Sequence, residues 1–308
     1  MEFLYLLEKI RTPFGDWLMG TLTHLGAETL FIVAALLFFW CLDKKKGYYL
    51  LFTGLSGVLS VQILKMACRI LRPWVLDPDF RIVESAREGA TGYSFPSGHT
   101  QCATGVYGSI ARSHRNWIVR TVSVAILVTV AFSRMYLGVH TPLDVLVSLG
   151  IGLFFVFALY PILDKAFTNH LGMLALFAFC TLFGLANLLF VELYAFPADV
   201  DLANLLNAKE TAWKLLAAIL GMLAAYLLDH YLVHFEVKAV WWVQMIKIAL
   251  GVGSFMLLRI LLKQPCNALL GEAAGGGLRY FLLVVWSGGI YPMLFPFLNK
   301  LDRKKKAA

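Results

Sequence analysis

Charged residues are scarce in this sequence, and their scarcity decides the class of protein. They make up 15% of the 308 residues, whereas hydrophobic residues make up 59%. Apolar runs close to the length that crosses about 30 Å of hydrocarbon recur along the whole chain. The composition therefore excludes an ordinary soluble domain and indicates an integral membrane protein.

Other signals are missing as well. The five cysteines include no CxxC pair, so neither a disulfide framework nor a zinc site is indicated. Glu2 and Glu8 stand where a cleavable signal peptide would have a basic start and an apolar core. There is no Asn-x-Ser/Thr sequon, and this leaves the compartment open.

The net charge of +8 is concentrated in short clusters such as Lys44–Lys46 and Arg303–Lys306. No basic stripe or aromatic-basic module accompanies these clusters, so nucleic acid is not an expected partner. Clusters of this kind mark the cytoplasmic loops of membrane proteins.

The hydrophobic segments predict an all-α, polytopic transmembrane bundle of about nine spanning helices. Residues 1–16 are expected to form an amphipathic segment that lies in the membrane interface. Spans are expected at about 17–41, 47–66, 97–115, 117–137, 141–165, 171–192, 211–232, 240–262 and 279–298.

Alternation of these spans places the polar stretches 66–97 and 133–141 on one side of the membrane. The basic stretches 43–46 and 112–120 fall on the opposite side, which their lysines and arginines mark as cytoplasmic. The expected topology has the N-terminus outside, the C-terminus inside and residues 66–97 on the non-cytoplasmic face.

Three polar clusters share that non-cytoplasmic face, each at the end of an apolar run. They are Lys65-x6-Arg72-Pro73, Pro96-Ser97-Gly98-His99 and Ser133-Arg134-x5-His140-x3-Asp144. Together they supply three cations, two histidines, a carboxylate, and a serine and a glycine ahead of a helix. This inventory is typical of a site that holds a phosphate and breaks a bond to it.

His140 and Asp144 are four residues apart at the start of a predicted helix, so they lie on one face. A carboxylate bonded to one imidazole nitrogen fixes the tautomer and leaves the other nitrogen free to attack phosphorus. The alternative is that Thr141 and Pro142 merely begin a capped helix. Capping alone does not explain Arg134 or the other clusters.

Ser97 and the Gly98 amide are predicted to bind a phosphoryl oxygen at a helix N-terminus, or else Ser97 is a plain N-cap. Lys65, Arg72 and Arg134 would neutralise the phosphate, although Lys65 alone could instead snorkel to the interface. If the helix continues to Pro73, Lys65 and Arg72 are two turns apart and face one pocket. Cationic side chains then do the work of a metal ion, so no metal and no cofactor are expected.

The three clusters resemble, in order and spacing, the signature motifs of the type 2 phosphatidic acid phosphatase (PAP2) superfamily, which includes vanadium haloperoxidases and glucose-6-phosphatase. The resemblance implies a phosphohistidine intermediate at His140, supported by Asp144, with His99 as the general acid. It also implies a PAP2 catalytic core within residues 1–166, with the motifs at 65–144. Residues 167–308 would then add transmembrane helices that shape a lipid entry path or form a homo-oligomer interface.

The expected function is hydrolysis of a lipid phosphomonoester or pyrophosphate, with membrane lipids as the surroundings. Two helices before the first motif and four after the core resemble the layout of glucose-6-phosphatase and the sphingosine-1-phosphate phosphatases, so these substrates stay open. A non-catalytic phospholipid transporter or scramblase is the rival, although its expected loss of His99, His140 or Asp144 is not seen. The site would face outward from a bacterial plasma membrane, or into the endoplasmic reticulum lumen of a eukaryote.

Overall fold

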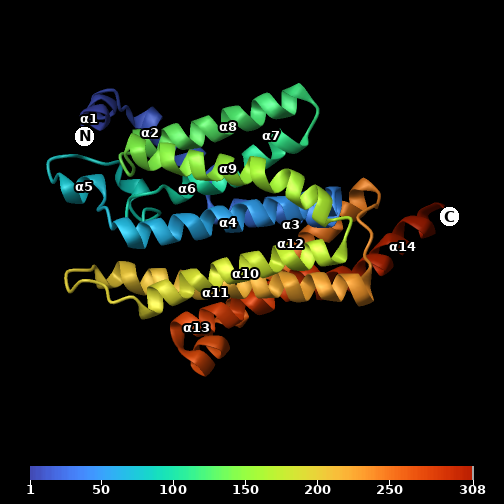
Figure 1. Ribbon diagram of the computed structural model, residues 1–308. Coiled ribbons are helices and arrows are strands. Elements are labelled where there is room, and N and C mark those ends of the chain that lie inside the picture. The colour runs from blue at the N-terminus through green and yellow to red at the C-terminus, as the bar shows by residue number, and fades with distance from the viewer. Residues whose placement is uncertain (307–308) are drawn as a thin grey trace. The chain divides into compact units, whose positions relative to one another are not determined.

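The computed structural model describes residues 1–306, with side chains through Leu301, and every regular element in that part of the chain is helical. The basic cluster Arg303–Lys306 lies outside the residues whose side chains are described. The elements, labelled in Figure 1 where there is room, are α1 (Glu2–Lys9), α2 (Pro13–Leu22), η1 (Thr23–Gly26), α3 (Glu28–Leu37), η2 (Phe38–Leu42), α4 (Lys44–Cys68), α5 (Pro73–Leu76), η3 (Glu84–Ala86), α6 (Gly98–Ala103), η4 (Thr104–Gly108), α7 (Ser109–Ser113), α8 (Trp117–Tyr136), α9 (Pro142–Ala166), α10 (His170–Leu193), α11 (Leu202–Leu228), η5 (Asp229–Val233), α12 (Trp241–Leu261), α13 (Lys263–Val285), η6 (Trp286–Ile290), η7 (Tyr291–Leu294) and α14 (Phe295–Lys306).

The expected bundle of membrane helices is confirmed. Among the residues described, seven helices are long and apolar enough to cross a membrane, and a bent pair at Pro13–Gly26 and Glu28–Leu42 makes eight. The expected count of about nine is therefore slightly high by this measure. The predicted helix at 97–115 does form, but a π-helical turn at Thr104–Gly108 interrupts it.

The chain divides into two compact units. Unit 1 comprises Met1–Ile32, Tyr49–Asp164 and Leu193–Ala208, and it holds all three polar clusters. Unit 2 comprises Val33–Tyr48, Lys165–Glu192 and Lys209–Ala308.

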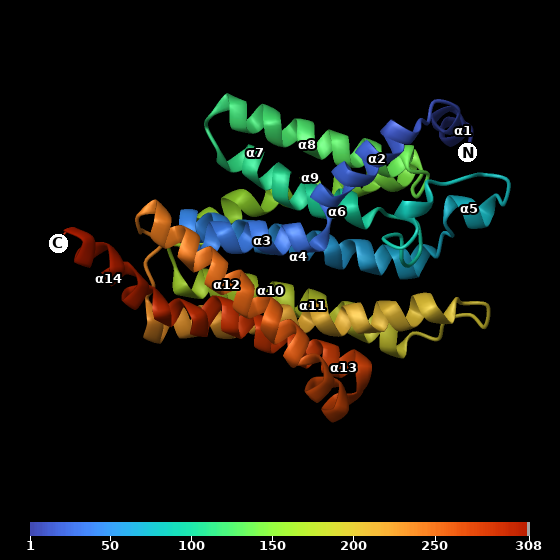
Figure 2. The same cartoon turned by 180° about the vertical axis from the view of Figure 1, so that it is seen from behind.

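In unit 1 the first span is broken, and the break brings its middle close to other helices. α2 and α3 are bent by 48° across η1, and both α6 and α8 contact η1 (Figure 2). Glycine is required at position 26, because a Cβ there would lie only 2.8 Å from the backbone oxygen of His99. The close approach of η1 to α6 thus depends on the absence of a side chain.

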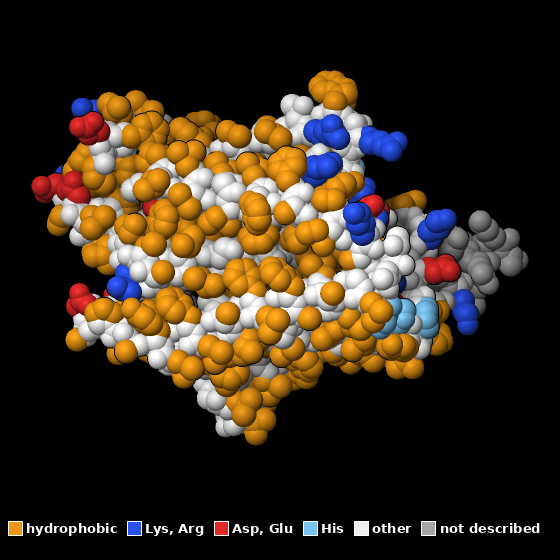
Figure 3. All heavy atoms as spheres, in the orientation of Figure 1, with side chains coloured by type: hydrophobic (Ala, Val, Ile, Leu, Met, Phe, Trp, Pro, Cys, Tyr) orange, Lys and Arg blue, Asp and Glu red, His pale blue; other side chains and the backbone are white. Residues whose placement is uncertain are grey.

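The surface of unit 1 matches a lipid environment. Hydrophobic side chains cover much of α8 and α9 in Figure 3, and Val128, Phe154 and Phe157 are each more than half exposed there. Exposed apolar side chains on this scale belong against acyl chains rather than water. Lysine and arginine side chains gather instead at the turn between α7 and α8.

Unit 2 has its own buried contacts. Lys44 forms an ion pair of 2.7 Å with Asp229, and the Trp40 indole donates a hydrogen bond of 2.8 Å to the Ser287 carbonyl. α13 is kinked at Gly271, where φ is 78°. The two predicted helices at 211–232 and 279–298 begin earlier than expected, as α11 and α13.

Candidate active site

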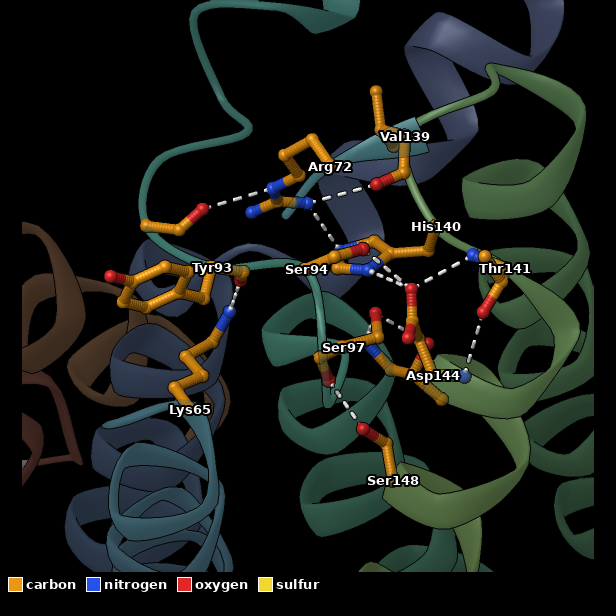
Figure 4. Close-up of polar contacts among 12 residues, drawn as sticks. Lys65, Arg72, Tyr93, Ser94, Ser97, Val139, His140, Thr141, Asp144 and Ser148 are labelled. Carbon is orange, nitrogen blue, oxygen red and sulfur yellow. Dashed lines mark hydrogen bonds and ion pairs between the residues drawn. The ribbon is translucent and has the colours of Figure 1, made fainter. Parts of the chain in front are cut away.

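The proposed nucleophile and its carboxylate lie side by side, both 2% exposed. His140 precedes α9 and Asp144 is in the first turn, with 3.3 Å between Nδ1 of His140 and Oδ2 of Asp144. On the other edge of the ring, Nη1 of Arg72 is 3.0 Å from Nε2 (Figure 4). An arginine can only donate, so Nε2 accepts and the ring proton is on Nδ1, facing Asp144. This is the tautomer that leaves a lone pair on Nε2.

The same carboxylate also caps α9. Oδ2 of Asp144 accepts a hydrogen bond of 2.8 Å from the Thr141 backbone N–H, and the Asp144 N–H donates to the Thr141 hydroxyl at 3.3 Å. The capping interpretation and the His140 contact are therefore both present in one residue. The cap fixes the carboxylate against the histidine.

Two hydrogen bonds join the beginning of α6 to that of α9. Ser97 is the N-cap of α6, and its backbone N–H donates to the Asp144 carbonyl at 3.1 Å. The Ser148 hydroxyl donates to the Ser97 carbonyl at 2.8 Å. A Cβ built on Gly98 meets nothing within 4 Å, so the backbone beside His99 borders open space.

Arg72 reaches the site from an extended backbone, so the condition that the helix of Lys65 continues to Pro73 is not met. α4 ends at Cys68, Arg69 has a φ of 49°, and Arg72 has φ −68° and ψ 151°. The cause is Pro73, because a proline disfavours the helical conformation in the residue before it. The extended conformation lets the guanidinium bridge several backbone carbonyls.

The three predicted phosphate ligands are all buried, at 8% for Lys65, 6% for Arg72 and 1% for Arg134. Lys65 Nζ donates to the Tyr93 carbonyl, so this lysine points into the protein rather than snorkelling. Arg72 donates to the Thr91, Gly92 and Val139 carbonyls at 2.7, 3.0 and 2.9 Å.

Arg134 is the least satisfied of the three cations. Its Nη1 donates to the Thr23 hydroxyl at 2.8 Å, while Nε and Nη2 are buried without a hydrogen-bond partner in the structure. Buried guanidinium donors without partners carry a large desolvation cost. A phosphate oxygen would satisfy them.

The charge balance of the cluster favours a dianion. Three cations face one carboxylate, Asp144, in a region shielded from water. Burial, followed by the positive charges of Arg72, Arg134 and Lys65, holds the pKa of His140 well below its ordinary value. The neutral form of His140 is therefore favoured, as a nucleophile requires.

The structure adds residues that the sequence interpretation did not single out. Ser148 follows Asp144 by four residues on the same helical face, and that spacing was a usable signal. Ser94 donates to Oδ2 of Asp144 at 2.6 Å from a polar loop, and Thr23 contacts Arg134 from a distant helix. Neither Ser94 nor Thr23 belongs to a local sequence pattern that would have indicated its contact.

Two family models match the chain. One, described as PAP2 superfamily, matches residues 45–168, and one described as PAP2 superfamily phosphatase, transmembrane extension, matches residues 213–304.

Individual proteins match about half of the chain. Phosphatidylglycerophosphatase B of Bacillus subtilis is 34% identical over 167 residues, which covers 48% of this chain and 75% of that protein. Undecaprenyl-diphosphatase of Sulfolobus acidocaldarius is 31% identical over 150 residues, covering 47% and 69%. A crystal structure of a transmembrane PAP2-type phosphatidylglycerolphosphate phosphatase from Bacillus subtilis aligns with a TM-score of 0.43 and 29% identity, over 53% of this chain and 84% of that one.

Proposed function

This chain belongs to the PAP2 superfamily, and from that premise we propose that it hydrolyses a lipid phosphate through a phosphohistidine at His140. That it is an integral membrane phosphatase of lipids follows from its family. The mechanism, the site residues and the substrate are the proposal. The observation that carries it is the lone pair of His140 Nε2, set by Asp144 on one side and Arg72 on the other.

In the first step the phosphate displaces Arg72 from Nε2 and takes up its guanidinium donors, together with those of Arg134 and Lys65. Nε2 attacks phosphorus and the bond to the lipid oxygen breaks. That oxygen takes a proton from His99 acting as general acid. Burial and the charge of Arg134 lower the pKa of His99 to about 3, so this ring carries the proton only when the negative charge of the bound phosphate lies beside it. Asp144 stabilises the positive charge that develops on the His140 ring.

In the second step a water molecule attacks the phosphohistidine and the N–P bond breaks. His99, now neutral, accepts the proton from that water and returns to its starting form. The three cations stabilise charge on the equatorial oxygens in both steps, which is the largest contribution in phosphoryl transfer. Because protein cations supply this stabilisation, the reaction needs no metal ion.

The substrate is proposed to be an anionic lipid headgroup at the non-cytoplasmic face. The relatives are named for phosphatidylglycerophosphate and undecaprenyl diphosphate, which makes these lipids the first to test. The basic turn between α7 and α8 lies at the opposite end of α8 from Arg134, as the positive-inside rule requires for an outward-facing site.

The test is phosphate release by the purified full-length protein in detergent with EDTA present. The panel is phosphatidylglycerophosphate, undecaprenyl diphosphate, phosphatidate, sphingosine-1-phosphate and glucose-6-phosphate. We expect release from one lipid, abolished in both His140→Ala and His99→Ala. Radiolabelled phosphate should be trapped on the wild-type chain but not on His140→Ala. Activity near wild type in His140→Ala would show that the nucleophile is another group.

A further inference from the structure

Ser94 lies outside the three sequence clusters, yet it is hydrogen-bonded to stretches of two of them and stands close to the third. Its backbone N–H donates to the carbonyl of Ile70, between Lys65 and Arg72, at 2.8 Å. Its hydroxyl donates to Oδ2 of Asp144 at 2.6 Å, and Ser97 follows three residues later (Figure 4). The side chain is fully buried, so no solvent competes for this hydroxyl.

The bond from Ser94 is the shortest that the carboxylate oxygen of Asp144 accepts. Oδ2 receives Ser94 Oγ at 2.6 Å, the Thr141 N–H at 2.8 Å and His140 Nδ1 at 3.3 Å. A buried carboxylate depends on such donors, and hydrogen bonds to a charged acceptor are about twice as strong as neutral ones. Ser94 and Thr141 therefore hold the carboxylate in place, and the imidazole follows it.

We infer that Ser94 is a positioning residue for the hydrolysis: it fixes Asp144 and, through Asp144, the orientation and tautomer of His140. The inference rests on the proposed function, in which His140 attacks phosphorus. Ser94 itself does not touch the phosphate, and its proton stays on its own oxygen throughout.

A pH signature separates this role from a merely structural one. The charged or titratable groups that act on His140 are Asp144, Arg72, Arg134, Lys65 and His99. Asp144 is the only anion among them. Without the Ser94 donor, the negative charge of Asp144 is stabilised by one hydrogen bond fewer. It then acts more strongly on the imidazole, which favours protonation of His140. The acid limb of kcat/KM should then move to higher pH.

The experiment compares Ser94→Ala and Ser94→Cys with wild type and with Ser148→Ala, each as the full-length protein in the same detergent. Cysteine keeps the approximate volume of serine but is only a weak donor. Ser148→Ala is the matched comparison: a buried hydroxyl near the site is lost, but its bond is to the Ser97 carbonyl and not to Asp144. The substrate's own ionisation is the same for all variants, so differences between profiles belong to the protein.

We expect kcat to fall about 10- to 100-fold in both Ser94 variants, the scale of losing an outer partner of a reactive group, with KM changed far less. We also expect their acid limb to shift upward, while that of Ser148→Ala stays at the wild-type position. Thermal melting curves close to wild type would show that the variants are folded.

Two results would overturn the inference: kcat of Ser94→Ala within twofold of wild type, or a loss of equal size at every pH. His140→Ala in the same assay distinguishes a failure of the proposed nucleophile from a failure of the Ser94 inference. If it is active, the proposed nucleophile is wrong. If it is inactive while Ser94→Ala is normal, only the role of Ser94 is wrong.

Discussion

At the scale of single residues, the site combines a neutral histidine with three buried cations. Arg72 contributes more than charge, because its planar guanidinium contacts His140 Nε2 and three carbonyls at once. An ammonium group cannot reproduce that fork. The identity of this side chain therefore matters as much as its charge.

Arg72→Lys should lower kcat/KM by roughly 10²- to 10³-fold, about 2–4 kcal/mol of transition-state stabilisation, although the charge is kept. The measurement is steady-state hydrolysis of the best lipid substrate. Arg69→Lys is the control, because the Arg69 guanidinium donates to the Met66 carbonyl of its own helix end. Full activity in Arg72→Lys would mean that only charge is needed.

The protonation of His140 gives a second prediction. Burial and the neighbouring cations hold its pKa well below the ordinary value, so the folded protein favours the neutral ring. As the pH falls below about 6.5, His140 therefore takes up a proton more readily in the unfolded chain than in the folded protein. The free energy of unfolding decreases as a result. In NMR spectra of the substrate-free protein, the ring signal that His140→Gln removes should stay neutral between pH 5 and 8. A midpoint at or above 6.5 would contradict this.

The sequence alone singled out several polar residues that lie together in the structure, because each is a charged or titratable residue at the end of an apolar run. They are Lys65, Arg72, Arg134, His140 and Asp144. The sequence was insufficient for Ser94 and Thr23. A serine in a polar loop and a threonine in an apolar helix look ordinary until the fold places them beside Asp144 and Arg134. Contacts of this kind join residues that are far apart in the sequence, so no local spacing of residues predicts them.

At the scale of elements, the bend between α2 and α3 is what brings Thr23 to Arg134. The sequence predicts one spanning helix over about 17–41, and this stretch contains no proline that would signal a break. The bend occurs where the 3-10 turn η1 meets Ala27, whose backbone is extended. The position of this kink depends on packing against α6 and α8.

Thr23→Val should therefore weaken the site through Arg134. The variant keeps the shape but removes the acceptor of Nη1, leaving a third buried donor unpaired at a cost of about 1–3 kcal/mol. We expect a lower melting temperature and weaker inhibition by orthovanadate, a phosphate mimic. Thr21→Val is the control, since the exposed Thr21 hydroxyl donates to the Trp17 carbonyl in the same helix. Equal behaviour of the two variants would show that Arg134 does not need Thr23.

At the scale of the whole molecule, the catalytic motifs and the compact units do not end at the same residue. Unit 1 takes in Leu193–Ala208, the connection between α10 and α11, far beyond the last motif. Within unit 1 the Asp201 N–H donates to the Tyr93 hydroxyl at 3.4 Å, and the Tyr93 carbonyl accepts from Lys65. The connection between α10 and α11 thus lies beside Lys65, a proposed phosphate ligand.

A chain truncated after residue 166 should accordingly lose most of its activity, although it keeps every motif residue. The control removes only residues 302–308, which lie outside unit 1. The measurement is lipid phosphate release per mole of protein recovered in detergent. Wild-type turnover by residues 1–166 would show that the α10–α11 connection is dispensable.

The contact between Arg72 and His140 has a consequence for selectivity. The lone pair on Nε2 of His140 is occupied by a guanidinium donor of Arg72, and only a ligand that competes for that donor uncovers it. Neutral esters, which abound in a bilayer, offer no such competition, and a phosphodiester offers less than a terminal phosphate. The proposed nucleophile is thereby protected from the bulk lipids by the charge that a ligand must carry, in addition to its burial.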